Sequence, residues 1–324
     1  MNTLDEPVLH LENVTKFYGK RLALDDVTLQ VSPGVTGLLG PNGCGKSTMI
    51  KCLLGLLKFQ QGRARVMGHE LPQGVRSIRD AVGYVPEDDC FLAGLSGIES
   101  TCFMARLSGL PAIEGLRRAH ESMDYADIGQ ERYRNVETYS TGMRQKLKFA
   151  QAIVHDPALL ILDEPTSGLD PAQRVSLLKK IKTLATHHNK SVLICTHILH
   201  DVSQICDNVV IMAAGRIKLV DSLENLSRPS RSGVQVRLEQ NTASADSLDS
   251  CLQTFMAAMT RAGHEFDRQS HDAFLIHNVQ PHQADSIWRA AADAGVTIFQ
   301  LKPAKNSLEE VFLSAVRETE HAVA

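Results

Sequence analysis

The stretch 35–57, VTGLLGPNGCGKSTMIKCLLGLL, decides the fold of this chain. Its first residues, VTGLLG, are typical of a buried strand, and the residues from Lys46 onward have the pattern of a helix. Between them, GPNGCGKST (40–48) fits the pattern G-x-x-x-x-G-K-[ST], in which a glycine-rich turn wraps backbone N–H groups around a phosphate chain. A chance glycine-rich turn before a helix is the alternative. The order strand, turn, helix favours a phosphate loop and predicts an α/β fold.

The residue types of this loop suggest their roles. Lys46 is expected to reach the terminal phosphates of a nucleotide, and Ser47 to offer its hydroxyl to Mg²⁺. Cys44 is further predicted to react with a maleimide, with loss of nucleotide binding. The residues expected to bind the nucleotide are Gly40, Pro41, Asn42, Gly43, Cys44, Gly45, Lys46, Ser47 and Thr48.

A second apolar run, LLILDEP (159–165), carries two carboxylates to the end of a buried strand. Ligands gather at this edge in open α/β sheets. Asp163 is therefore expected to hold Mg²⁺, directly or through water, and Glu164 to orient or deprotonate the water that attacks the γ-phosphate. A pair of solvated acids at a strand end is the alternative for both residues.

A third run, SVLICTH (191–197), ends in Thr196 and His197 on a neighbouring strand. An imidazole there can reach the same edge of the sheet. A single histidine in such a place is more often structural, but beside the other nucleotide elements it favours a contact with the γ-phosphate.

The remaining pattern predicts the organisation of a first domain, residues 1–226. Residues 7–31 alternate apolar and polar positions, which indicates antiparallel strands joined by a turn at Gly19 and Lys20. A helical insertion is predicted at about 95–138. The apolar runs at 159–165 and 191–197 flank a predicted helix at 171–186. This unit of strand, helix and strand implies a parallel sheet buried on both faces.

A linker is predicted at 227–233, within the sequence LSRPSRSG (226–233), and a second domain at 234–324. Its pattern of strands and helices reads β-α-β-β-α-β, followed by a final helix, which predicts a small ferredoxin-like α+β domain. Its residues do not converge on any chemistry. A dimerisation or regulatory module is the expected role.

Composition excludes some function classes. The 324 residues suggest two domains, and 34 basic against 37 acidic residues give a formal net charge of −3, which does not favour nucleic-acid binding. Seven scattered cysteines without a C-x-x-C pair predict reduced thiols. The start of the chain lacks the pattern of a signal peptide, and its apolar runs are shorter than a membrane span needs. The expected location is therefore the cytoplasm.

Taken in order, the motifs resemble a known family. FYGK, GPNGCGKST, GYVPE, YSTGM, LLILDEP, SGLD and TH occur in this order between residues 8 and about 220. Each motif is modest by itself, but their order and spacing resemble the nucleotide-binding subunit of an ATP-binding cassette (ABC) transporter. The resemblance implies that ATP is the nucleotide.

The resemblance also implies a dimer. In this family two subunits meet head to tail, and the signature motif of one completes the ATP site of the other. Here that motif would contribute Ser140, Thr141, Gly142 and Met143 at the start of a helix, whose N-terminus carries a partial positive charge suited to the γ-phosphate.

Four further roles follow from matching motif residues. Tyr18 would stack on adenine, although a partly buried strand aromatic is the alternative. Asp170 would communicate across the dimer interface. Glu164 would be the catalytic base and His197 the γ-phosphate sensor.

The chain departs from the family pattern at two places. The commonest signature, Leu-Ser-Gly-Gly-Gln, is replaced by Tyr139 to Met143, which removes one glycine and one amide. Glu87 stands where a glutamine usually touches magnesium, and a carboxylate can also bind Mg²⁺. These departures and the tail NSLEEVFLSAV (306–316) resemble the export branch, in which stand-alone ATPases pair with a separate membrane protein.

The expected function is therefore an ATPase subunit, with ATP and Mg²⁺, that drives a membrane permease from the inner face of the cytoplasmic membrane. Its other partner would be a second copy of itself or a related ATPase subunit, and no nucleic acid is expected. A soluble ABC-type switch in translation or DNA repair is one alternative, but such proteins usually carry two cassettes or a coiled coil. A phosphate-loop kinase is another, for which an acceptor site would be needed.

Overall fold

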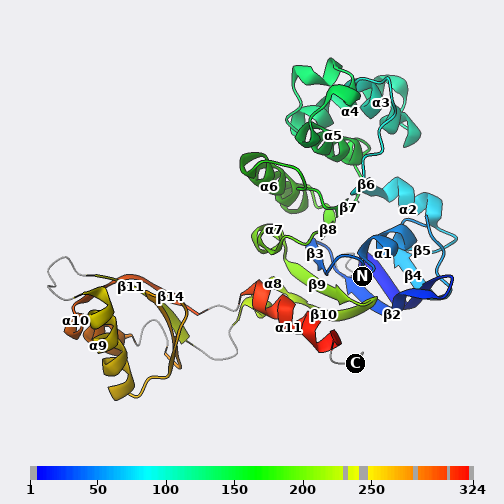
Figure 1. Ribbon diagram of the computed structural model, residues 1–324. Helices are drawn as coiled ribbons and strands as arrows, with labels where there is room; N and C mark the ends of the chain where they lie inside the picture. Colours follow the sequence, from blue (N-terminus) through cyan, green and yellow to red (C-terminus); the bar gives the residue numbers. More distant parts are fainter. Residues whose placement is uncertain (1–5, 229–232, 241–246, 280–283, 305–306, 321–324) are drawn as a thin grey trace. The chain divides into compact units, whose positions relative to one another are not determined.

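The computed structural model describes residues 6–228, 233–240, 247–279, 284–304 and 307–320 (Figure 1). The chain divides into two compact units. The first ends at Leu223 and resumes at Phe312, and the second runs from Glu224 to Val311. Most of the predicted linker at 227–233 lies outside the described residues, and the boundaries 1–226 and 234–324 stay predictions.

A six-stranded sheet forms the centre of the first unit, with strand order β10-β9-β3-β8-β7-β6. Neighbouring strands from β9 to β6 are parallel, and β10 is antiparallel to β9. All residues of β3, β7 and β8 are buried, as expected for a parallel sheet covered on both faces. The predicted parallel core is confirmed. The strands are β3 (Val35–Leu39), β6 (Val82–Val85), β7 (Leu159–Asp163), β8 (Ser191–Cys195), β9 (Asn208–Ala213) and β10 (Arg216–Ser222).

The connecting helices place the motif residues at one edge of this sheet. Helix α1 follows β3 through the phosphate loop, α6 connects β7 to β8, and α7 follows β8. Because parallel strands end at the same edge, the segments after β3, β7 and β8 lie close together. The helices are α1 (Lys46–Leu53), α6 (Pro171–His187) and α7 (Leu199–Ile205).

A second, antiparallel sheet has the order β2-β1-β4-β5. The turn at Gly19 and Lys20 joins its first two strands, as predicted. A shared apolar core, with Leu9, Val27 and Met49 among its fully buried members, joins this sheet to α1 and to the central sheet. The elements are β1 (Leu9–Tyr18), β2 (Arg21–Val31), β4 (Gln61–Val66) and β5 (His69–Glu70), followed by α2 (Val75–Ala81).

The helical insertion lies between β6 and β7, as predicted, and appears at the top of Figure 1. Its first helix begins at a capping box. The Ser96 hydroxyl accepts from the Glu99 N–H at 3.4 Å, and the Glu99 carboxylate accepts from the Ser96 N–H at 2.8 Å. The insertion comprises α3 (Gly97–Leu107), α4 (Ala112–Tyr125), the 3₁₀ turns η1 (Gln130–Tyr133) and η2 (Val136–Thr138), and leads into α5 (Thr141–Ile153).

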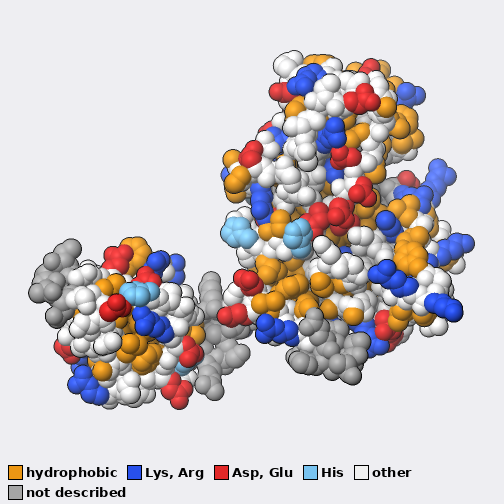
Figure 2. Space-filling view, in the orientation of Figure 1, with side chains coloured by type: hydrophobic (Ala, Val, Ile, Leu, Met, Phe, Trp, Pro, Cys, Tyr) orange, Lys and Arg blue, Asp and Glu red, His pale blue; other side chains and the backbone are white. Residues whose placement is uncertain are grey.

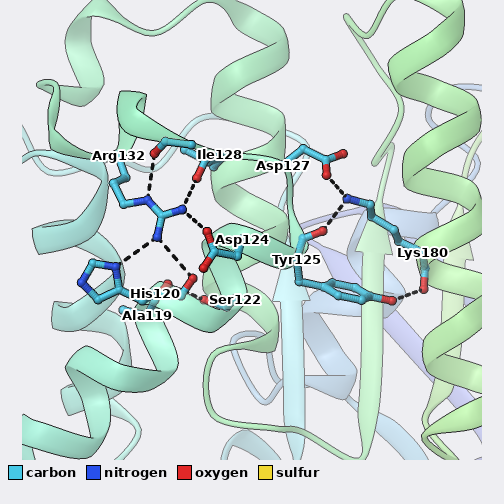
Figure 3. Close-up of polar contacts among 10 residues, drawn as sticks. Ala119, His120, Ser122, Asp124, Tyr125, Asp127, Ile128, Arg132 and Lys180 are labelled. Atoms are coloured by element: carbon cyan, nitrogen blue, oxygen red, sulfur yellow. Dashed lines mark hydrogen bonds and ion pairs between the residues drawn. The ribbon is translucent and has the colours of Figure 1, made fainter.

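The end of α4 is fastened to α6, as Figure 3 shows. Lys180 Nζ donates to the carbonyl oxygen of Tyr125 at 2.5 Å and pairs with the Asp127 carboxylate at 2.6 Å. In return, the Tyr125 hydroxyl donates to the carbonyl oxygen of Lys180 at 2.9 Å. The nearly buried guanidinium of Arg132 closes the turn after α4, where it pairs with Asp124 and donates to three main-chain carbonyls. The insertion is thus anchored to a helix of the central domain.

The second unit has its own apolar core and the predicted ferredoxin-like order of elements. Its antiparallel sheet has the order β12-β13-β11-β14, and side chains of α9 and α10 pack in the same core. The elements are β11 (Gly233–Gln240), α9 (Leu248–Arg261), β12 (Phe266–Arg268), β13 (Ala273–His277), α10 (Asp285–Asp293) and β14 (Val296–Pro303). Helix α8 (Leu223–Ser227) stands at the start of this unit, and α11 (Leu308–Glu320) begins in it and belongs to the first unit from Phe312 on.

Among the described residues, no helix combines the length and apolar character that crossing a membrane would require.

Candidate active site

A cavity of about 560 Å³ opens where the phosphate loop meets the ends of β1 and β7 and the turn between β9 and β10. In Figure 2, acidic side chains gather between the helical insertion and the sheets on the visible face. Ten residues singled out from the sequence line the cavity: Tyr18, Asn42, Gly43, Gly45, Lys46, Ser47, Thr48, Glu87, Asp163 and Glu164. Five further lining residues were missed: Arg21, Leu22, Ala23, Ala214 and Gly215.

The backbone of the phosphate loop requires a glycine at one position. Gly45 has a φ of +114°, and a Cβ there would lie 2.8 Å from the carbonyl oxygen of Ala23, so a glycine is required. The ammonium of Lys46 is buried and donates to the carbonyl oxygens of Gly40 at 2.7 Å and Pro41 at 3.2 Å. Two carbonyls of the loop itself therefore hold the ammonium in place.

The acidic side of the cavity has the donor set of a divalent cation. Asp163 is only 2% exposed, and burial, followed by the charge of Glu87, raises the pKa of its carboxyl to about 6. A hydrogen bond from Ser47 opposes this rise in pKa, while the charge of Glu164 adds to it. Carboxylate and hydroxyl oxygens are ligands that Mg²⁺ prefers, and a cation would relieve the repulsion among these acids. The residues thus fit Mg²⁺, with Ser47, Asp163 and Glu87 as candidate ligands.

Glu164 is held in an unusual backbone conformation. Its φ of +49° lies in the left-handed region, which costs a residue other than glycine about 1–2 kcal/mol. Its N–H donates to the carbonyl oxygen of Cys195 at 2.8 Å, and its carboxylate accepts from the Thr196 hydroxyl at 3.2 Å and the His197 N–H at 3.1 Å. The Nδ1 of His197 lies 2.8 Å from the same carboxylate. The structure therefore places the His197 imidazole against the Glu164 carboxylate, and much of the imidazole stays exposed.

The signature residues are not among the residues that line this cavity. Ser140 caps α5, and its hydroxyl accepts from the Met143 N–H at 3.3 Å. Ser140 and Thr141 are exposed, and Gly142 is buried. Asp170, also exposed, caps α6 by accepting from the N–H of its third residue at 2.8 Å. Both caps leave a helix N-terminus on the surface of the chain.

A buried carboxylate that the motifs did not reveal lies beneath the site. Asp201 on α7 is fully buried and accepts from the Thr166 hydroxyl at 2.7 Å and from Nε of Arg174 at 2.7 Å. It joins α7 to the segment that follows Glu164 and to α6. In the sequence, only its position four residues after His197 could have pointed to a place near the site.

The predicted reactivity of Cys44 is corrected by its surroundings. The thiol is buried inside the loop, and burial raises its pKa, so little thiolate is available to attack a maleimide. We expect maleimide to label the exposed Cys90 well before Cys44, as measured by mass spectrometry of tryptic peptides over time. Rapid labelling of Cys44 in a Cys90→Ser protein would contradict this expectation.

Comparison with known proteins identifies the family. The family model described as ABC transporter matches residues 24–167. The uncharacterized ABC transporter ATP-binding protein YdbJ of Bacillus subtilis (strain 168) is 32% identical over 311 residues, which cover 96% of this chain and 96% of that protein. The chain belongs to the ABC transporter family. It is an ATP-binding subunit and an ATPase, as the motifs predicted.

Two further likenesses bear on this ABC ATPase. The Nod factor export ATP-binding protein I of Cupriavidus metallidurans (strain ATCC 43123 / DSM 2839 / NBRC 102507 / CH34) is 36% identical over 210 residues, which cover 64% of this chain and 69% of that protein. A solved ATP binding subunit of an ABC transporter is 30% identical, with a TM-score of 0.63, and the match covers 68% of this chain and 91% of that one. The predicted fold class is confirmed.

Proposed function

We propose that this ABC ATPase is the motor subunit of an exporter whose translocation path is formed by a separate integral membrane protein. The observation that carries the motor role is the convergence of Lys46, Ser47, Asp163 and Glu164 on one cavity. The export direction is supported by the Nod factor export relative.

The cavity would hold one ATP. Tyr18 is 46% exposed at its wall and is free to stack on adenine, while Lys46 and the loop N–H groups bind the phosphates. Ser47, Asp163 and Glu87 would hold Mg²⁺, which when bound offsets the negative charge of the phosphates.

Hydrolysis would depend on Glu164 and His197. The Glu164 carboxylate orients the attacking water and accepts its proton. Because Nδ1 of His197 contacts that carboxylate, the imidazole both fixes the orientation of Glu164 and leaves Nε2 for the γ-phosphate.

A dimer would complete each site. Ser140, Thr141, Gly142 and Met143 lie outside the lining of their own cavity, which supports their use on the nucleotide of a second subunit. The N-terminus of α5 would meet the γ-phosphate there, and Asp170 would sense the partner across the interface. The partner is a second copy of this chain or a related ATPase subunit.

The helical insertion would carry the contact with the membrane protein. Phe103, Leu107 and Ile113 are exposed apolar side chains on α3 and α4, and Ile113 is 88% exposed. These three side chains are the candidates for the contact with that partner. The expected location is the inner face of the cytoplasmic membrane, through that partner.

A capture experiment tests the proposal. Tagged Glu164→Gln protein, loaded with MgATP, is mixed with detergent-solubilised membranes of its own organism, and bound proteins are identified by mass spectrometry. The matched control also carries Lys46→Ala, so that it cannot load ATP. We expect one integral membrane protein with several spanning segments to depend on ATP for capture. Recovery of ribosomes or DNA-associated proteins instead would favour the soluble switch.

A further inference from the structure

Gln145 lies on α5, five residues after Ser140, and is only 4% exposed. Its Nε2 donates to the main-chain carbonyl oxygen of Glu164 at 3.0 Å. A side chain of the signature helix therefore touches the residue that carries the proposed base of the same chain. No motif pointed to this contact.

The contact falls on a backbone that needs support. Glu164 has a left-handed φ, and such a conformation persists only where surrounding bonds fix it. Its carbonyl accepts one other bond, from the Ser167 N–H at 3.2 Å. Loss of the Gln145 donor leaves that local turn bond as the remaining hydrogen bond to this carbonyl among the described residues. The main chain can then relax and carry the carboxylate with it.

The start of α5 touches the same segment a second time. A Cβ on Gly168 would lie 2.6 Å from Cγ2 of Thr141, so the threonine methyl rests against the glycine backbone. The segment between Glu164 and Gly168 is held from below, where Thr166 donates to Asp201. Helix α5 thus bears on both ends of a short segment that is itself anchored.

We propose that Gln145 is a positioning residue that ties the signature helix to Glu164. When the start of α5 engages the nucleotide of a partner subunit, the shift of the helix reaches the base of its own chain through this bond. The inference rests on the proposed role of Glu164.

The test compares two glutamines of the same helix in the full chain. Gln145→Met keeps the length of the side chain and removes the donor. Gln151→Met removes an equivalent bond, from Nε2 to the Ser100 hydroxyl at 2.8 Å, which lies in the helical insertion. Gln145→Met is expected to lower kcat for ATP hydrolysis about tenfold or more, because misplacement of a reacting group by about 1 Å can cost about a hundredfold. KM for ATP, the directly measured ATP affinity and the melting temperature should match those of Gln151→Met.

A second comparison excludes a merely structural effect. In a Glu164→Gln background, Gln145→Met should cause little further loss in the single-turnover rate, because the group that it positions is already gone. A kcat equal to that of Gln151→Met, or a full additional loss beside Glu164→Gln, would overturn the proposal. If Glu164→Gln alone stays active, the proposed function of Glu164 fails. If Glu164→Gln is inactive but Gln145→Met is normal, only the positioning role fails.

Discussion

Glu164→Gln is expected to lower kcat for ATP hydrolysis by about a hundredfold or more, the usual effect of losing a catalytic base. The amide keeps the shape of the side chain but cannot take up the proton of the attacking water. ATP affinity should change little, because Lys46 and the phosphate loop are untouched. Phosphate release and equilibrium nucleotide binding measure the two quantities. Glu70→Gln is the matched control, because Glu70 is exposed and pairs with Arg65 on the antiparallel sheet.

The same variant should accumulate as a dimer in MgATP. If each γ-phosphate is held between two subunits, slow hydrolysis keeps the shared sites closed. Light scattering during gel filtration, with and without MgATP, checks this expectation. A monomer at saturating ATP would contradict the shared-site model, and an undiminished kcat would contradict the role of Glu164 as base.

Lys46→Ala is expected to weaken ATP binding by at least about a hundredfold. Hydrogen bonds to charged groups contribute about 1.5–3 kcal/mol each. The loss of two such bonds to the phosphates, at about 1.4 kcal/mol for each factor of ten, accounts for this weakening. The loop itself should stay folded, since within the described part of the chain the ammonium donates only to the carbonyls of Gly40 and Pro41.

Lys51→Ala serves as the control for that experiment, because Lys51 is an exposed lysine in the last turn of the same helix. Isothermal titration with MgATP compares the two variants. Equal and unchanged affinity in both would mean that ATP does not bind in this cavity.

The sequence predicted those strands whose own residues form a clear apolar run. Strands β3, β7 and β8 are entirely buried, so their apolar runs are unambiguous. The strand β4, QGRARV, buries only two of its six residues, and β10 alternates exposed and half-buried positions. Neither has a buried apolar run like those of the central strands, and both owe their conformation to a neighbouring strand.

The candidate site divides in the same way. Residues that bind through a local turn, such as Lys46 and Ser47, are visible as a motif. Gln145 and Asp201 act on groups 19 and 35 residues away in the chain, so only the folded chain brings the partners together. The left-handed backbone of Glu164 likewise depends on the bond from its N–H to Cys195 on the adjacent strand.

Helix α6 has a mechanical consequence. It begins next to Asp170, at the proposed interface, and ten residues later, about 15 Å along its axis, Lys180 grips the end of α4. A continuous helix of 17 residues resists bending, so a displacement at Asp170 is expected to reach the helical insertion through α6. Helix α6 would thus couple the two regions, and the hydrogen bonds between Tyr125 and Lys180 are the contact through which its movement would reach α4.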